Sequence, residues 1–171
     1  MTTQVTFRQA DERDLDLLVG LYEGAARWMA RSGSVQWRPG GRGAEYFRGR
    51  ISEREVWLAY AAEGGPLVGS YELWWDDEPA WGPQPPVAGY VHGLMIDRDT
   101  APAGTGATLL ADAEARITAG GRGLARLDCL ARVERLRSYY EKAGYRVVGE
   151  NTGKPQPDGS HNRFTLMEKS L

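Results

Sequence analysis

The stretch LMIDRDTAPAGTGATLLADAEARI, residues 94–117, begins with the pattern of a strand and ends with the pattern of a helix. An apolar run at 94–96 leads into a Pro/Ala/Gly turn, after which apolar residues recur at helical spacing. Gly104 and Gly106 therefore lie where the helix starts. Such an end carries unpaired N–H groups and about half a positive charge, which suits a phosphate or another anion. The stretch predicts an anion-binding loop, with a purely turn-forming role for the glycines as the alternative.

Two nucleotide-binding motifs share features with this loop and are excluded. A dinucleotide-binding loop has a third glycine, but Leu109 stands at that position. Such a loop also begins at the end of its strand, whereas residues 97–103 intervene between Ile96 and Gly104. A phosphate-binding P-loop needs Gly-Lys-Ser/Thr, which does not follow here. Dinucleotides and nucleoside triphosphates are therefore not the expected ligands.

The length and the net charge of the chain limit the classes of protein to which it can belong. With 171 residues the chain has the length of one domain, 1–171. Lys plus Arg total 21 against 23 Asp plus Glu, and a net charge of −2 gives no bulk attraction to nucleic acid or to an anionic membrane. No segment approaches the ~20 apolar residues that span a bilayer, and the N-terminal residues do not read as a signal peptide. We expect a cytoplasmic protein with Cys129, its one cysteine, as a buried and inert thiol.

The order of the expected elements indicates a mixed sheet with helices on both faces. Strands are expected near 6–10, 56–62, 66–75, 87–97, 123–131, 145–150 and 163–171. Helices are expected near 11–33, 44–52, from the glycine loop to 119, and at 133–144, where Gly144 ends the helix. The segment DDEPAWGPQPP, residues 76–86, is expected to lack regular structure because of its prolines.

Three segments together resemble the GNAT family of acyl-CoA-dependent N-acetyltransferases, and the resemblance covers nearly the whole chain. YVHGLMIDRDTAPAGTGATLLADAE is similar to the family's acyl-CoA motif, a strand followed by (Q/R)xxGx(G/A) and a helix. LARLDCLARVERLRSYYEKAGYRVVGE resembles the motif that follows it, and FRQADERDLDLLVGLYEGAARW resembles the N-terminal strand and helix. The resemblance implies an α/β (α+β) fold with a mixed, mostly antiparallel sheet of about six to seven strands and about four helices.

The resemblance also implies acetyl-CoA as co-substrate, with no metal. Its pyrophosphate would lie against the backbone N–H groups of the glycine loop, where side chains would block the approach. The loop positions that match are Ala103, Gly104, Thr105, Gly106 and Ala107. The strand positions that match the pantetheine and thioester contacts are Leu94, Met95 and Ile96.

The loop departs from the family pattern in its charges. Ala101 stands where Gln or Arg is usual, Ala103 where a second Arg is frequent, and Pro102 has no N–H. Val133 replaces an Asn that commonly opens the later helix. Each lost contact to phosphate would cost ~1 to 3 kcal/mol, so either binding is weak or other cations compensate. The candidates for compensation are Arg98, Arg132 and Arg135.

Acetyl transfer needs an acid for the leaving thiolate and a base for the amine. Tyr140 matches the family tyrosine that protonates the CoA sulfur, with a core role as the alternative. His92 is the first choice for the base, because alternation places it on one strand face with Tyr90 and Leu94 and a histidine titrates near neutral pH. Glu72, acting through water, is the second choice. Asp128 is the third, and we interpret it as a hydrogen-bonded buried carboxylate.

The acceptor pocket is expected to be aromatic, because rings enclose apolar or cationic amines well. The expected pocket residues are Trp28, Trp37, Trp74 and Tyr90. The predicted activity is acetylation of a small-molecule amine by direct attack, with a small-molecule partner and with no nucleic acid or membrane; a homodimer is left open. The alternatives are a protein or peptide N-acetyltransferase and a catalytically weak CoA- or ligand-binding module.

Overall fold

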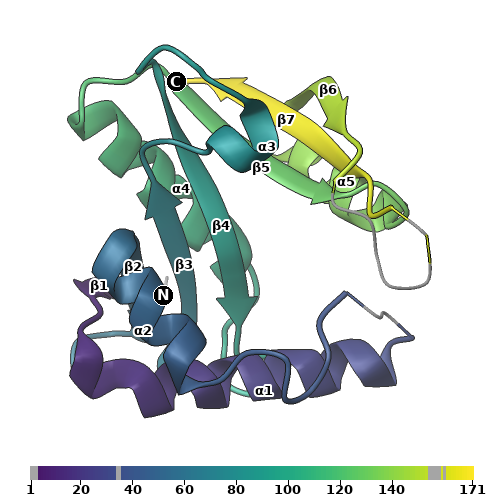
Figure 1. The fold of residues 1–171 in the computed structure, drawn as a ribbon. Coiled ribbons are helices and arrows are strands. Elements are labelled where there is room, and N and C mark those ends of the chain that lie inside the picture. Colours follow the sequence, from purple (N-terminus) through teal and green to yellow (C-terminus); the bar gives the residue numbers. More distant parts are fainter. Residues whose placement is uncertain (1–3, 34–35, 154–158, 160) are drawn as a thin grey trace. The chain divides into compact units, whose positions relative to one another are not determined.

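The computed structural model describes residues 4–33, 36–153, 159 and 161–171. Within them, the chain forms seven strands, five α-helices and one 3₁₀ helix (Figure 1). The strands are β1 (Val5–Gln9), β2 (Glu55–Ala61), β3 (Leu67–Trp74), β4 (Ala88–Ile96), β5 (Leu124–Leu130), β6 (Arg146–Asn151) and β7 (Phe164–Ser170). The helices are η1 (Glu12–Asp14), α1 (Leu15–Arg31), α2 (Ala44–Glu53), α3 (Glu78–Trp81), α4 (Thr105–Ala119) and α5 (Glu134–Lys142).

The strands form one sheet in the order β1-β2-β3-β4-β5-β7-β6. Strand β4 runs parallel to β5, whereas β1/β2, β2/β3, β5/β7 and β6/β7 pair antiparallel. The predicted mixed, mostly antiparallel sheet is therefore confirmed. The helix count is five rather than about four, because α3 lies in a segment predicted to lack regular structure. Asp77 caps this short helix by accepting from the Ala80 N–H, and Pro79 is tolerated in a first turn.

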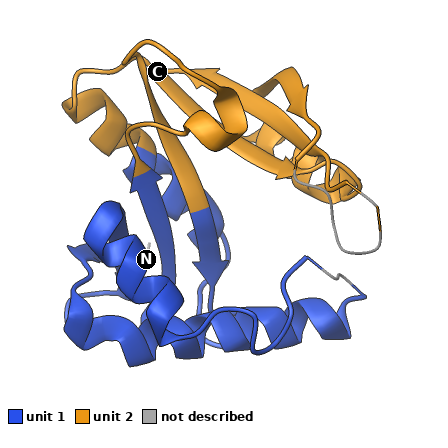
Figure 2. Cartoon of the chain, viewed as in Figure 1, with its two compact units in different colours: residues 1–73, 93–113 blue, residues 74–92, 114–171 orange. Residues whose placement is uncertain are grey.

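The chain divides into two compact units, shown in different colours in Figure 2. Unit 1 comprises residues 1–73 and 93–113, and unit 2 comprises residues 74–92 and 114–171. The boundary falls inside β4 and inside α4. Each unit is described by itself below.

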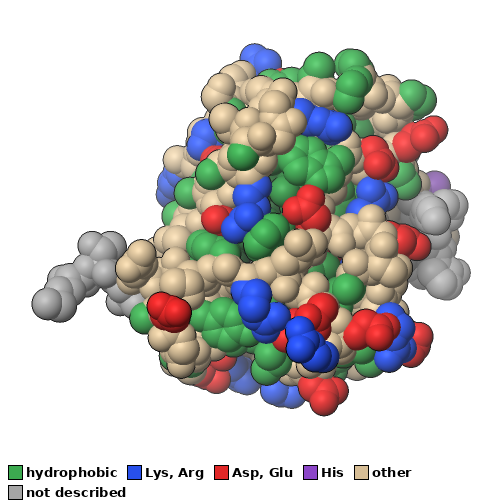
Figure 3. Space-filling model, turned by 90° about the vertical axis from the view of Figure 1, so that its left-hand side faces the viewer, with side chains coloured by type: hydrophobic (Ala, Val, Ile, Leu, Met, Phe, Trp, Pro, Cys, Tyr) green, Lys and Arg blue, Asp and Glu red, His purple; other side chains and the backbone are tan. Residues whose placement is uncertain are grey.

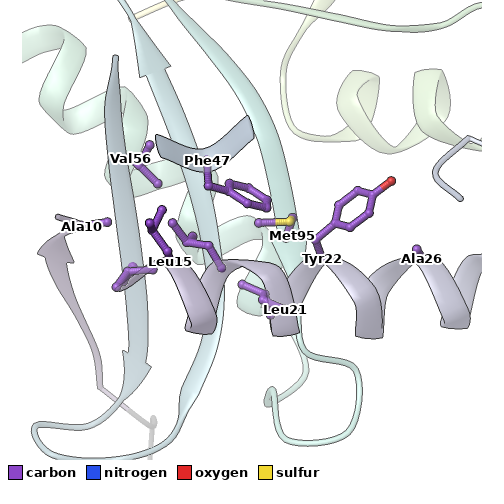
Figure 4. Close-up of a cluster of buried hydrophobic side chains, with 10 residues drawn as sticks. Ala10, Leu15, Leu21, Tyr22, Ala26, Phe47, Val56 and Met95 are labelled. Atoms are coloured by element: carbon purple, nitrogen blue, oxygen red, sulfur yellow. The ribbon is translucent and has the colours of Figure 1, made fainter. Parts of the chain in front are cut away.

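The core of unit 1 has helices on both faces of its strands. Val56 and Leu58 of β2 pack into a buried cluster with side chains from α1, α2 and the end of β4 (Figure 4). The other strand face meets α4, because a Cβ at Gly69 would lie 2.9 Å from Leu109 Cδ2. On that same face the Tyr71 hydroxyl donates to Asp112 Oδ2 at 2.5 Å. The period-two alternation of strands thus separates the two layers.

The core of unit 2 is organised around a buried arginine. Arg126 on β5 donates to Glu168 Oε2 of β7 at 2.9 Å and to the Tyr90 hydroxyl at 3.0 Å. Its guanidinium also lies over the Trp81 ring, 4.9 Å from the centroid. Such a buried charge is satisfied by paired hydrogen bonds and aromatic faces rather than by water.

Strand β4 is interrupted at Gly93, whose φ of +57° lies in the left-handed region. A residue of that conformation breaks the alternation of side chains, as it does at a β-bulge. The predicted single face through Tyr90, His92 and Leu94 is therefore wrong beyond His92. The interruption matters because it comes directly after the histidine expected to act as base.

The surface agrees with the small net charge. The face in Figure 3 carries Lys and Arg interspersed with Asp and Glu, without a broad field of one sign. Across the part of the chain that the structure describes, none of the helices has both the length and the apolar character needed to cross a membrane.

Candidate active site

The glycine loop of unit 1 is shaped by a left-handed residue at the helix start. Gly104 has a φ of +84° and immediately precedes α4, which begins at Thr105. A side chain in that conformation is strained, so glycine is favoured there by the backbone itself. A Cβ built at Gly104 meets no atom within 4 Å, so the space beside the loop is open. No side chain of the described residues fills the position beside Gly104.

Thr105 holds the loop together from within. Its N–H donates to the Pro102 carbonyl at 3.3 Å, and its Oγ1 donates to the same oxygen at 2.7 Å. The Thr108 N–H closes the first helical bond onto Gly104 at 3.1 Å. First-turn N–H groups have no partner inside a helix, which leaves those of Gly106 and Ala107 directed out of the helix end. These two N–H groups, rather than that of Thr105, are the candidates for the predicted pyrophosphate contacts.

The strand positions predicted to receive the thioester have buried or partly buried side chains. Met95 and Ile96 are buried and Met95 belongs to the core cluster of unit 1, whereas Leu94 is partly buried. Any contact with a pantetheine chain at Met95 or Ile96 would have to use N–H or carbonyl groups.

Glu72, the second choice for the base, is buried on β3 and already engaged. Its Oε1 lies 3.4 Å from Arg50 Nε, and a Cβ at Gly93 would lie 2.5 Å from its Oε2. The carboxylate thus packs against the interruption of β4, which only glycine permits. Arg50 competes with any water or amine for the Glu72 oxygens.

His92, the first choice, lies between two carboxylates in unit 2. Its Nε2 is 2.8 Å from Asp77 Oδ2, and its Nδ1 is 3.7 Å from Asp128 Oδ1. The Trp74 ring packs against the imidazole with centroids 4.0 Å apart and an interplanar angle of 33°. Two segments distant in sequence, 74–77 and β5, therefore contribute the side chains around one histidine ring.

Asp77 is the site residue that the sequence reasoning missed. Its side chain is only 2% exposed and both of its oxygens are used, one by His92 and one by the Ala80 N–H. A signal was present, because Asp followed by Glu-Pro is typical of a helix N-terminus. The prolines of residues 76–86 predict a lack of regular structure, whereas Pro79 lies in the first turn of α3.

Asp128 is a partly exposed carboxylate whose pKa is raised by burial, with the nearby Asp77 adding to the increase and His92 opposing it. It points to the opposite strand face from its neighbour Cys129, because successive β5 side chains alternate. Cys129 is buried, as predicted, and burial raises the pKa of its thiol to about 11. The thiol is thus protonated and unreactive at neutral pH.

Tyr140 lies on α5, in contact with the rings of Tyr139 and Tyr145 at centroid distances of 5.3 and 6.1 Å. Burial is the main cause that raises the pKa of its phenol above the ordinary value, and the neighbouring Cys129 and Asp128 add to the shift. The phenol therefore holds its proton throughout the physiological range. That state is the one required of a general acid.

The four predicted pocket aromatics are divided between the two units. In unit 1, Trp37 stacks near Tyr22 at 5.5 Å, and Trp28 lies under the Arg98 guanidinium at 4.3 Å. In unit 2, Trp74 packs on His92, whereas Tyr90 is 2% exposed and bound to Arg126. Trp74 touches a candidate catalytic group, and Tyr90 has the contacts of a core residue.

Of the three arginines considered for the phosphates, Arg98 is exposed and lies over Trp28, and Arg132 and Arg135 are exposed at the start of α5. Among the described residues, no group of three or more His, Cys, Asp or Glu side chains is arranged to hold a metal ion.

The mixed sheet and the helix that begins at the glycine loop are typical of an acyl-CoA-dependent acyltransferase. The chain belongs to the GNAT family, since the model of the acetyltransferase (GNAT) domain matches residues 41–171. It is accordingly an acetyl-CoA-dependent N-acetyltransferase.

Individual relatives agree with this assignment. The chain is 29% identical over 147 residues to the uncharacterized N-acetyltransferase YesJ of Bacillus subtilis (strain 168), covering 80% of this chain and 78% of the relative. A GNAT acetyltransferase structure from Listeria monocytogenes 4b F2365 is 25% identical with a TM-score of 0.77, covering 100% of this chain and 99% of that one. The PaiA N-acetyltransferase of Thermoplasma acidophilum, solved in complex with coenzyme A, has a TM-score of 0.69 at 17% identity, covering 98% and 99%.

Proposed function

We propose that this enzyme transfers the acetyl group of acetyl-CoA to a small primary amine by direct attack, with Tyr140 as acid and His92 as base. The observation that carries the proposal is the pair of proton-transfer groups within unit 2. Tyr140 is a protonated phenol near Cys129, and His92 is an oriented imidazole near Asp128. Because Asp128 lies beside His92 and acts together with Cys129 on the Tyr140 phenol, the acid and the base candidates both neighbour the same segment of β5.

Direct transfer needs an acid and a base that act on the same thioester. The amine loses a proton as its nitrogen attacks the thioester carbonyl, and the C–S bond breaks on the other side of the tetrahedral carbon. The leaving thiolate then takes the Tyr140 proton. Glu72 acting through water is the alternative base, and its ion pair with Arg50 makes it the weaker candidate.

The cofactor site of the proposal is the glycine loop. The N–H groups of Gly106 and Ala107 and the positive end of α4 suit the pyrophosphate, and the open space beside Gly104 admits it. Membership in the GNAT family supports acetyl-CoA as the cofactor. The PaiA N-acetyltransferase, which has a similar fold, was solved in complex with coenzyme A.

The test is release of free thiol from acetyl-CoA over a library of monoamines, polyamines, aminoglycosides and N-terminal peptides. We expect turnover of at least one small primary amine, with peptides slower by ~10-fold or more. Turnover confined to peptides would replace the small-molecule acceptor by a protein. Thiol release at the same rate without any amine would mean that the chain is a weak CoA-binding module.

A further inference from the structure

We propose that Asp128 and His92 Nδ1 together hold the primary ammonium of the acceptor, and that Asp77 is a positioning residue that keeps Nδ1 free of its own proton. The inference rests on the proposed function, because it describes how the same site receives its amine. It assigns roles to two carboxylates that face one imidazole from different segments, Asp77 from the segment that caps α3 and Asp128 from β5.

The first step concerns the tautomer of His92. Asp77 is 2% exposed and bonded to His92 Nε2 at 2.8 Å, and an ionised carboxylate only accepts hydrogen bonds. The proton of a neutral His92 must therefore be on Nε2. Its lone pair is then on Nδ1, the nitrogen that faces Asp128.

The second step concerns the gap between His92 Nδ1 and Asp128 Oδ1. At 3.7 Å the two atoms are too far apart for a direct hydrogen bond, and both are acceptors when Asp128 is ionised. One nitrogen with several N–H groups can donate to both at the usual ~2.8 to 2.9 Å. An ammonium group has that chemistry, with a third N–H to spare.

The third step concerns charge. The titratable groups facing His92 are Asp77 and Asp128, and those acting on Asp128 are the same histidine and Asp77. Trp74 covers the imidazole ring itself. Two carboxylates beside one imidazole form a site of negative charge that a cationic amine neutralises.

The proton balance follows from this arrangement. The bound ammonium gives one proton to His92 Nδ1, and the imidazolium formed is stabilised by Asp77 at Nε2 and by Asp128 at Nδ1. The freed lone pair attacks the acetyl carbon, the C–N bond forms and the C–S bond breaks. The thiolate takes the proton of Tyr140, and the nitrogen loses its second proton as the amide forms. That second proton restores the Tyr140 phenol through solvent, and the histidine proton returns to solvent, so one proton is released in all.

The first experiment reads the tautomer without using activity. The chain has two histidines, so ¹⁵N-histidine NMR of the wild type and of His161→Gln assigns His92 directly. At a pH where His92 is neutral, we expect its proton on Nε2, and we expect Asp77→Asn to move part of the population to Nδ1–H. A neutral His92 with Nδ1–H in the wild type would overturn the role given to Asp77.

The second experiment uses the best amine acceptor from the library. We expect Asp128→Asn to raise KM for that amine by ~10- to 100-fold while leaving Kd for acetyl-CoA within ~2-fold. We expect Asp77→Asn to lower kcat by ~10-fold and to alter the pH profile of kcat/KM. Asp76→Asn, which removes the same charge one residue away from Asp77, is the matched control and should change neither constant by more than ~2-fold.

If Asp128→Asn left the KM for the amine unchanged, Asp128 and His92 Nδ1 would not hold the ammonium, even if the enzyme acetylates amines. Loss of activity equal in Asp76→Asn and Asp77→Asn, with an unchanged pH profile, would reduce Asp77 to a cap of α3. If no amine is acetylated at all, the proposed function fails, while the NMR result still decides the tautomer.

Discussion

The glycine loop of unit 1 and the His92 cluster of unit 2 are built in opposite ways. The loop is made by contiguous residues and offers backbone N–H groups, with Gly104 in a left-handed conformation and Thr105 bonded to Pro102. The cluster is made by side chains from three separate segments, with Asp77, His92 and Asp128 brought together by the fold. A site made of backbone tolerates few residue types at its turn, whereas a site made of side chains depends on a few particular atoms.

The difference shows which changes would damage each site. A charge or side chain introduced at the loop acts on the ligand directly. Removal of a single charge in the cluster acts on the amine and its proton transfer and leaves acetyl-CoA binding in place. The predictions below separate these two behaviours.

The largest effect is expected from Gly104→Asp. The new carboxylate would enter the open space beside the loop and repel the pyrophosphate, so calorimetry should show acetyl-CoA binding weakened by ~10²-fold or more. Thermal stability should change little, because Asp tolerates the left-handed conformation better than most residues.

Two matched variants check the cause. Gly104→Asn adds the same volume without charge and should weaken binding less. Gly121→Asp places a carboxylate at another left-handed glycine with open space, at φ +82°, and should leave binding unchanged. If Gly104→Asp bound acetyl-CoA with wild-type affinity, the pyrophosphate would not bind at this loop.

The next effect in size is expected from Tyr140→Phe, with a loss of ~10²-fold in kcat at unchanged Kd for CoA. Only the phenolic proton is removed, while the ring contacts with Tyr139 and Tyr145 remain. Tyr139→Phe is the control, since it removes the same atom from the adjacent side chain. Near-normal turnover of Tyr140→Phe at every pH would make Tyr140 a packing residue.

A smaller effect is expected from Glu72→Gln, which should lower kcat/KM less than the ~10- to 10³-fold expected for His92→Ala. In the wild type, kcat/KM should rise with pH, and His92→Ala should flatten that rise if His92 is the base. A pH-rate profile of both variants decides between them. Should Glu72→Gln flatten the profile and His92→Ala leave it intact, the carboxylate acting through water is the base.

The sequence predicts the loop better than the cluster for a physical reason. A strand, a turn and an amphipathic helix are local patterns, so residues 94–117 indicate both the fold and the anion site. The cluster depends on which side chains a parallel β4/β5 pair and the α3 segment bring together, and no local pattern states that. His92 and Asp128 were found as separate candidates. Asp77 was not predicted, because the prolines around it favour irregular structure over the short helix that it caps. The predicted face of β4 is wrong beyond His92, because the backbone of Gly93 is in the left-handed region.

The smallest effect concerns stability and compares two aspartates, one in each unit. Burial raises the pKa of Asp128, so the folded state holds its proton more tightly than the unfolded chain does. Stability contributed by this group is present below the unfolded pKa of about 3.9 and is lost as pH rises through the raised folded value. Asp128→Asn should therefore be slightly more stable than the wild type at pH 7, by ~2 °C in Tm, and the gain should shrink toward pH 4.

Asp14 should change the stability with pH in the opposite direction, because its pKa is lowered rather than raised. Arg8 donates to both of its oxygens, at 3.0 and 2.7 Å, and these bonds lower the pKa of Asp14. Its contribution is present above the unfolded pKa and is lost as pH falls through the folded value, so Asp14→Asn should lower Tm at pH 7 and converge on the wild type in acid. Thermal melts of both variants from pH 4 to 8 make the comparison. If both aspartates stabilise the fold at pH 7, Asp128 is a structural carboxylate satisfied by its neighbours, and the case for an ammonium ligand at that position loses its electrostatic support.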